Sequence, residues 1–447
     1  MTFFRRGRYW YWIVRDLAAK YTRAWGLGFI LGGSIAVLSW FVTPRIYQQF
    51  FAPVERYGIV GEFSPTNLPL PIQQLLSHGL TSVQSDGRVV PDLAESWVAT
   101  DGGKQYIFRL HNDREWHSGK SVTASDINYN IKDVTLTPVD DTTLRVDLTA
   151  PFSPFPTLVS RPIFQKGLIG LGVYKVANIQ LKGDKVQYLK IAPVTEKNLP
   201  IREYRFYRTE VLAVLAYKLG EIDILEDVAS PHDLTSWGTA SVSAKLMHNR
   251  IVTLFLNMNN LLLREKNIRL ALGYAVPALS MENAKSPIQA SSWAYTDDVR
   301  DFHQDTPTVK RLLQNSPIST TSAELTISTF SQYLDSAQKI SDSWNSYGIK
   351  NAVRVENIVP SDYQVLLTAQ DVPPDPDQYP LWHSTQQQTN ITGYANVKID
   401  KLLEDGRIEQ DEEKRKKIYE DFQKRLVDDA PALFLYYPSS YTITRGK

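Results

Sequence analysis

The stretch 106–129 places a strand pattern, a tight turn and a helix start in direct succession. Tyr106, Phe108 and Leu110 alternate with polar residues, which is typical of a strand with one buried face. A Ser-Gly turn follows, and Thr-Ala-Ser-Asp at 123–126 has the form of a capping box that opens a helix. Taken alone, this succession is ordinary local structure, and its significance depends on the motifs around it.

The composition is that of a globular protein, and it excludes several kinds of function. The chain has 447 residues, of which 43% are hydrophobic, so two or three domains with a sizeable core are expected. A net charge of +1 and the lack of a basic cluster after residue 23 argue against nucleic-acid binding. The absence of cysteine excludes disulfides, thiol catalysis and thiolate metal sites.

An uncharged apolar run near the N-terminus predicts a membrane anchor. Residues 24–42 are long enough to span a bilayer core and contain no charged side chain. The cations that precede this run, against the single acid Asp16, are Arg5, Arg6, Arg8, Arg15, Lys20 and Arg23. Positive charge stays inside, so 1–23 is expected in the cytoplasm, 43–56 as a linker, and the remaining chain outside the cell. The alternative is a cleaved signal peptide.

The C-terminal part carries the clearest helix pattern. Asp411 can cap a helix, and Ile418, Phe422 and Leu426 lie four residues apart on one face. A proline then ends the pattern, and 432–437 is predicted to be a buried strand.

Several motifs occur in an order that is typical of one protein family. Residues 91–97 are Pro-Asp-Leu-Ala-Glu-Ser-Trp, and 116–120 are Trp-His-Ser-Gly-Lys. Leu-Phe-Leu-Asn at 254–257 precedes Ile-Arg-Leu-Ala-Leu-Gly-Tyr-Ala at 268–275. A last matching stretch covers 390–436. Together the motifs resemble the extracellular solute-binding proteins of family 5, which include the dipeptide- and oligopeptide-binding proteins of ABC importers.

The resemblance covers about 57–441 and implies a two-lobed fold. That fold is α/β and periplasmic-binding-protein-like, of type II with an extra subdomain, here behind an N-terminal transmembrane helix. Lobe I is expected at 57–255, with a small subdomain inserted at about 72–158. Lobe II is expected at 256–431, and 432–447 is expected to return to lobe I.

No pattern for catalysis or metal binding stands out, apart from one cluster of acids. The seven histidines have no metal-ligand spacing, and neither a nucleophile elbow nor a phosphate loop occurs. No cofactor is expected. Asp371, Asp375 and Asp377 share one proline-rich segment. Asp375 and Asp377 could serve as acid and base in a hydrolase, or the segment could be a stiff polar loop.

The resemblance implies a further role for this segment. Family members carry a D-x-x-D-P motif in the cleft between the lobes, and its first aspartate pairs with the α-ammonium group of a peptide. Here Asp371 lies one residue farther from Pro376 than in that motif, so either a one-residue insertion displaces Asp371 or Asp375 has taken the role. Tyr379, Trp382 and His383 follow closely and are expected either to line the cleft or to pack under a long loop.

The resulting interpretation is a binding protein rather than an enzyme. We expect a monomer that is anchored in the membrane, binds peptides outside the cell and delivers them to an ABC permease. Two alternatives remain. The ligand could be another small solute, such as a sugar or a metal chelate, or the scaffold could serve as a surface hydrolase or sensor.

Overall fold

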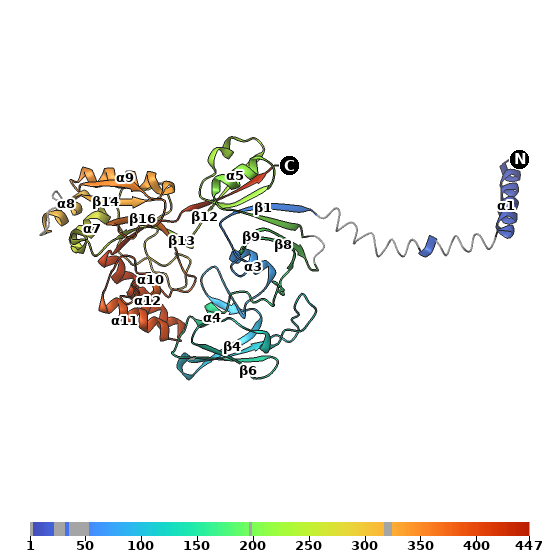
Figure 1. Ribbon diagram of the computed structural model, residues 1–447, viewed down its shortest axis with the longest axis horizontal. Coiled ribbons are helices and arrows are strands. Elements are labelled where there is room, and N and C mark those ends of the chain that lie inside the picture. The colour runs from blue at the N-terminus through green and yellow to red at the C-terminus, as the bar shows by residue number, and fades with distance from the viewer. Residues whose placement is uncertain (1–2, 22–31, 35–52, 196–198, 317–323, 447) are drawn as a thin grey trace.

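The computed structural model shows a body of sheets and helices and a separate N-terminal helix (Figure 1). The residues that it describes are 3–21, 32–34, 53–195, 199–316 and 324–446. The predicted membrane span 24–42 and linker 43–56 therefore lie largely outside the described residues. Among the helices of the described part, none combines the length and the apolar composition that crossing a membrane requires.

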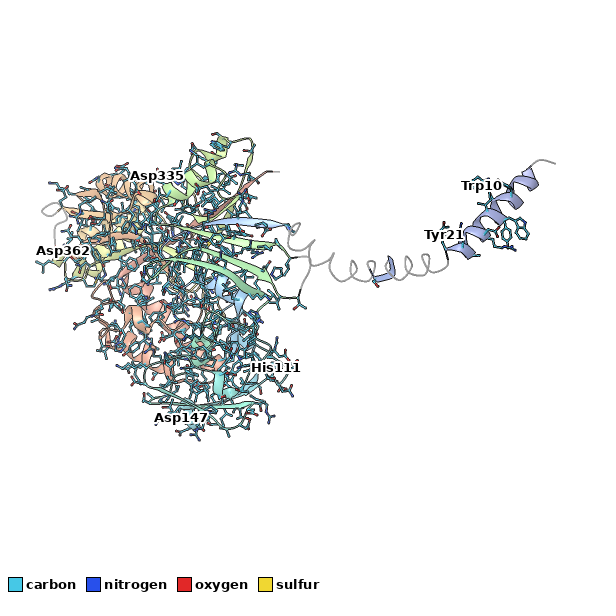
Figure 2. The ribbon with its side chains drawn as sticks, turned by 45° about the vertical axis from the view of Figure 1, so that its right-hand side comes forward. Trp10, Tyr21, His111, Asp147, Asp335 and Asp362 are labelled. Carbon is cyan, nitrogen blue, oxygen red and sulfur yellow. The ribbon has the colours of Figure 1, made fainter. Side chains whose placement is uncertain are left out.

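The described helices have the following bounds. They are α1 Phe3–Lys20, α3 Leu70–Leu76, α4 Phe155–Leu158, α5 Glu210–Lys218, α6 Leu261–Arg264, α7 Lys266–Tyr274, α8 Thr306–Gln314, α9 Leu334–Ser346, α10 Tyr379–Trp382, α11 Val397–Ile408 and α12 Glu412–Asp429. Figure 2 labels Trp10 on α1 and Tyr21 directly after its end, both within the predicted cytoplasmic segment.

The described strands form two large sheets and two small ones. They are β1 Val54–Val60, β2 Thr81–Val83, β3 Val89–Pro91, β4 Ala94–Thr100, β5 Gln105–Leu110, β6 Val134–Pro138, β7 Thr143–Leu148, β8 Tyr174–Lys182, β9 Lys185–Pro193, β10 Ile201–Tyr207, β11 Ile224–Val228, β12 Ala240–Leu246, β13 Arg250–Leu256, β14 Leu325–Thr329, β15 Asn351–Val355, β16 Val365–Asp371, β17 Ala432–Tyr436 and β18 Ser439–Arg445.

The first large sheet has seven strands in the order β12-β18-β11-β1-β10-β9-β8. Tyr57, Tyr204 and Leu189 are cross-strand neighbours on the face that packs against α3. Leu225 and Tyr217 belong to the core under α5, on the other face. In Figure 1 the two helices accordingly lie on opposite sides of the sheet.

The second large sheet has five strands in the order β15-β14-β16-β13-β17. Side chains of β13 alternate between its two faces, as expected for a strand buried on both sides. Val252 and Leu254 pack with Trp344 of α9, whereas Phe255 packs with Phe422 of α12. Helices therefore cover both faces of this sheet.

A four-stranded antiparallel sheet, β4-β5-β7-β6, forms the small subdomain. Its core contains Tyr106, Phe108 and Leu110 of β5, so the predicted strand is confirmed. The capping box of Thr123 and Asp126 is also present, but it opens only one short 3-10 turn. The predicted helix was wrong, because the chain turns through positive φ angles soon afterwards and then pairs as β6 with β7.

The chain crosses between the two large sheets at two adjacent places. Residues 247–249 connect β12 to β13, and 437–438 connect β17 to β18. The crossings contact each other, since Met247 N donates to Pro438 O at 2.9 Å. From the sequence, the lobe boundaries were expected after residues 255 and 431, which would place β13 and β17 in lobe I. In the structure both strands belong to the five-stranded sheet, because they pair with each other.

Opposite these crossings, the small subdomain contacts the lobe that carries the five-stranded sheet. Arg88 lies 3.0 Å from Glu412 at the start of α12, and Ser153 N donates to Arg407 O at 2.7 Å. The space between the two lobes is thus bounded by the paired crossings on one side and by these contacts on the other.

Candidate functional site

Strand β16 has a free edge at its C-terminal end. It pairs with β13 over its full length, from Val365 to Asp371. On its other side it pairs with β14 only as far as Leu367, opposite Thr329, where β14 ends. Within the described residues, 368–371 therefore has a strand neighbour on one side only.

The register shows which backbone groups face the free side. Val372 N donates to Asn249 O at 2.8 Å, so even-numbered residues of this strand point their N–H and C=O groups towards β13. Odd-numbered residues point the other way, in agreement with the bond from Thr329 Oγ1 to Leu367 O. The backbone groups of Ala369 and Asp371 consequently face the free edge, which can accept a further strand.

A hollow of about 180 Å³ adjoins this edge. It is smaller than a site that encloses a whole small molecule, and it fits one side chain of a ligand. Its lining includes Phe255, Thr368, Gln370, Trp382, Thr389 and Ile391. The indole Nε1 of Trp382 is buried and has no hydrogen-bond partner among the described residues.

Asp371 lies at the end of the free edge and is open to solvent. Its side chain is 76% exposed, and Oδ1 accepts a hydrogen bond from Arg250 Nε at 2.7 Å. Arg250 faces Asp371 across the strand pair, and Asp227 and Tyr333 also act on it electrostatically. Burial alone would lower the pKa of Arg250, but the hydrogen bond and charge of Asp371 raise it above its ordinary value.

Asp375 has the opposite surroundings. Its side chain is 10% exposed, and both carboxylate oxygens accept hydrogen bonds from Arg415, at 2.6 and 2.9 Å. Burial alone would lower the pKa of Arg415, but the charge and hydrogen bonds of Asp375 keep it above its ordinary value. This bidentate pair is largely buried within the lobe that carries the five-stranded sheet.

Asp377 and the aromatic residues after it form a stacked group under Arg407. Arg407 donates to Asp377 at 2.9 Å and lies 3.9 Å above the ring of Tyr379. Tyr379 in turn stacks on buried His383 at 4.0 Å. Of the five candidate residues, the structure places Asp371 at the free edge of β16 and the buried Trp382 in the wall of the hollow beside it. Asp375, Tyr379 and His383 do not line that hollow.

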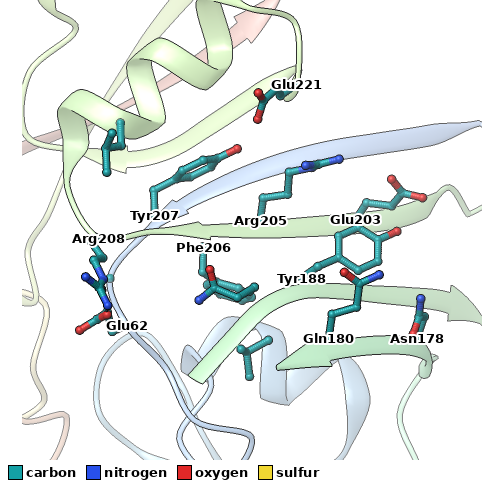
Figure 3. Close-up of a pocket in the computed structure, with 14 residues that line it drawn as sticks. Glu62, Asn178, Gln180, Tyr188, Glu203, Arg205, Phe206, Tyr207, Arg208 and Glu221 are labelled. Atoms are coloured by element: carbon teal, nitrogen blue, oxygen red, sulfur yellow. Dashed lines mark hydrogen bonds and ion pairs between the residues drawn. The ribbon is translucent and has the colours of Figure 1, made fainter. Parts of the chain in front are cut away.

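Asp375 and Arg415 also line a hollow of about 270 Å³ between the small subdomain and the lobe of the five-stranded sheet. A hollow of about 540 Å³ lies on the seven-stranded sheet beside α5, with Tyr188, Glu203 and Arg205 on its floor (Figure 3). His111 lies on the small subdomain (Figure 2), and its neighbour His117 pairs with Gly172 O at 2.8 Å. In the described part of the chain, no group of three or more acidic or histidine side chains is placed to hold a metal ion.

Two lobes on separate sheets, joined by paired crossings, define a periplasmic-binding-protein-like fold. Residues 88–390 match the bacterial extracellular solute-binding proteins, family 5, in the middle region of that family. The chain belongs to this family of non-enzymatic solute-binding proteins of ABC transporters. It is accordingly an extracellular or periplasmic binding protein.

Curated relatives match over most of their length. The dipeptide-binding protein DppE of Bacillus subtilis is 22% identical, with 93% of this chain and 94% of the relative covered. The probable D,D-dipeptide-binding periplasmic protein DdpA of Escherichia coli is also 22% identical, with 84% of each chain covered.

Solved structures agree on the fold. The oligopeptide-binding protein AppA of Bacillus subtilis, in complex with a nonapeptide, has a TM-score of 0.65 at 21% identity and covers 88% of this chain and 94% of its own. NikZ of Campylobacter jejuni, in complex with Ni(L-His), has a TM-score of 0.71 at 20% identity, with the same coverage. At these identities the likeness shows the fold.

The sequence did not reveal the three arginines that pair with the aspartates of the segment 371–377. Arg250, Arg407 and Arg415 each pair with one aspartate of the segment, and each lies far from it along the chain. The free edge of β16 was also missed, because it depends on where β14 ends. Only the position of Arg250 at the start of an apolar run carried a signal, since an arginine there must find a partner at the end of the sheet.

Proposed function

We propose that this chain is a membrane-anchored receptor that binds a short peptide along the free edge of β16 and delivers it to an ABC permease. The observation that carries the proposal is that Ala369 and Asp371 turn their backbone groups to a side without a neighbouring strand. An extended peptide can add a strand to such an edge, with main-chain hydrogen bonds that do not depend on sequence. The peptide complex of the similar AppA supports this choice of ligand.

Within this proposal Asp371, rather than Asp375, receives the peptide's α-ammonium group. Asp375 is held by Arg415 from both oxygens and is buried, whereas Asp371 is exposed and shares only one oxygen with Arg250. Trp382 contributes to the wall of the hollow that would receive a side chain of the peptide. Tyr379 and His383 would support this wall from behind.

Calorimetry of the full chain with trialanine and N-acetyl-trialanine tests the proposal. Because Asp371 is exposed and already paired, we expect acetylation to weaken binding by about fivefold, or roughly 1 kcal/mol. Asp371→Asn should abolish the difference between the two peptides. Asp335→Asn changes an exposed acid of α9 and is the matched control. It should leave the difference between the two peptides unchanged.

Equal binding of both peptides to the parent chain would show that Asp371 does not read an amino terminus. Ni(L-His) and an uncharged disaccharide are titrated in parallel. If either of these binds while neither peptide does, the proposed ligand class is wrong, although the chain is still a solute-binding protein.

We further propose that the paired crossings act as a hinge on which the lobes close. Segments 247–249 and 437–438 are short and adjacent, so a small rotation there changes the whole space between the lobes. Small-angle scattering should show a smaller radius of gyration with saturating trialanine. An unchanged profile would contradict closure.

A further inference from the structure

Helix α5 exposes an apolar stripe on the side that faces away from its sheet. The helix buries Ala213, Val214, Ala216 and Tyr217 against the seven-stranded sheet. Its outer side, between 47% and 70% exposed, consists of Val211, Leu212, Leu215 and Leu219. Three of these, at 211, 215 and 219, are four residues apart and share one face.

This stripe differs from scattered apolar residues, because it is continuous along a helix of only nine residues. Solvent-exposed helix faces normally carry charged and polar side chains. A contiguous apolar strip of this kind marks a surface that is covered by a partner. Leu212 also borders the hollow of Figure 3, which extends the surface onto the sheet.

The C-terminal end of α5 lies beside the point where the body of the protein begins. Arg56 of β1 donates from Nη1 to Gly220 O at 3.0 Å and pairs with Asp223 at 2.7 Å. Leu219 directly precedes that glycine. Val54 is the exposed first residue of β1 and lies two residues before Arg56 in that strand.

The distance to the membrane is set by the chain that precedes β1. Residues 43–53 separate the predicted span 24–42 from Val54. Even fully extended, these residues reach at most roughly 40 Å, and any less extended form brings β1 and α5 closer to the lipid. The α5 stripe therefore belongs to the lobe that the linker tethers within this reach of the bilayer that the anchor is predicted to occupy.

We propose that the α5 stripe docks on the outer surface of the lipid bilayer and orients the seven-stranded lobe on it. This inference rests on the proposed membrane anchor. Aliphatic side chains on one face of a helix insert at the boundary between headgroups and acyl chains. The anchor supplies proximity, so even a weak surface contact is populated.

The absence of cysteine makes a direct test possible, because an introduced thiol is unique in the chain. Leu215→Cys, labelled with a fluorophore, is placed with the full chain in nanodiscs that contain a lipid with a nitroxide headgroup. We expect strong quenching by that lipid. The matched control is Val139→Cys on the small subdomain. Val139 is somewhat more exposed than Leu215, at 60% against 50%, yet a label there should be quenched several-fold less.

A second variant distinguishes specific docking from simple proximity. With the label at Val211→Cys, the changes Leu215→Ser and Leu219→Ser should remove most of the quenching without lowering peptide affinity. Equal quenching of labels at 215 and 139, no quenching at 215, or quenching unaffected by the serine changes would each overturn docking. If the chain fails to remain in the nanodisc, the anchor itself is wrong and the docking fails with it.

Discussion

Asp371 and Asp375 lie in one short segment and have opposite surroundings. Asp371 sits at the free end of β16 with its side chain in solvent, and Asp375 lies in the interior, paired on both oxygens by Arg415. Burial and the bonds from Arg415 to both oxygens shield Asp375 from a ligand, whereas Asp371 is exposed and paired through one oxygen only. The comparison teaches that an acid cluster in a sequence can divide into a structural member and a binding member.

The largest effect is expected at the structural member. Asp375→Asn leaves Arg415 buried without a compensating charge, which should lower the free energy of unfolding by about 3–5 kcal/mol. Urea denaturation followed by tryptophan fluorescence measures this loss. Replacing both partners, with Asp375→Asn and Arg415→Met, should restore part of it. A single variant as stable as the parent would show that the pair is not needed in the interior.

Asp429 is an intermediate case that sharpens the comparison. Burial alone would raise the pKa of Asp429, but hydrogen bonds from Lys266, Tyr394 and Asn396 outweigh it and lower the pKa. A lowered pKa adds stability that is present above the ordinary value near 4 and is lost as the pH falls through the lowered value.

We therefore expect Asp429→Asn to cost about 1–2 kcal/mol at pH 7. The difference from the parent should shrink as the pH falls below about 4, because the parent carboxylate then becomes protonated. Denaturation at pH 7 and pH 3 checks this. A difference that is constant with pH would mean that the charge of Asp429 contributes nothing.

The smallest effect on stability is expected at the binding member. Asp371 and Arg250 are both more than one-third exposed, and such pairs contribute little. Asp371→Asn should change the free energy of unfolding by less than about 0.5 kcal/mol while it alters peptide affinity. A loss comparable to that of Asp375→Asn would erase the distinction between the two acids.

Local patterns predicted those parts of the structure that depend on neighbouring residues. Helix α12 begins after Asp411, whose side chain accepts from Lys414 N, and it buries Phe422 and Leu426 as expected. Ile418 is only half-buried, and Tyr419 takes the interior position instead. Helix capping and a four-residue hydrophobic repeat depend only on residues within one or two helical turns, so they can be predicted from the sequence.

Parts that depend on distant residues were not predictable in the same way. The sheet to which β17 belongs is decided by β13, far away along the chain, and the burial of Asp375 by Arg415, 40 residues on. The acids of the segment could be found from the sequence, but their separation into two roles could not. The fold as a whole was predicted through the order of its motifs, which the family match confirms.

The central claim is that a peptide adds a strand to the free edge of β16, and hydrogen exchange of single backbone amides tests it most directly. On addition of trialanine, the amides of Ala369 and Asp371 should exchange more slowly. Those of Thr368 and Gln370, which point towards β13, are internal controls and should change little. Unchanged exchange at Ala369, or equal slowing at all four residues, would contradict strand addition at this edge.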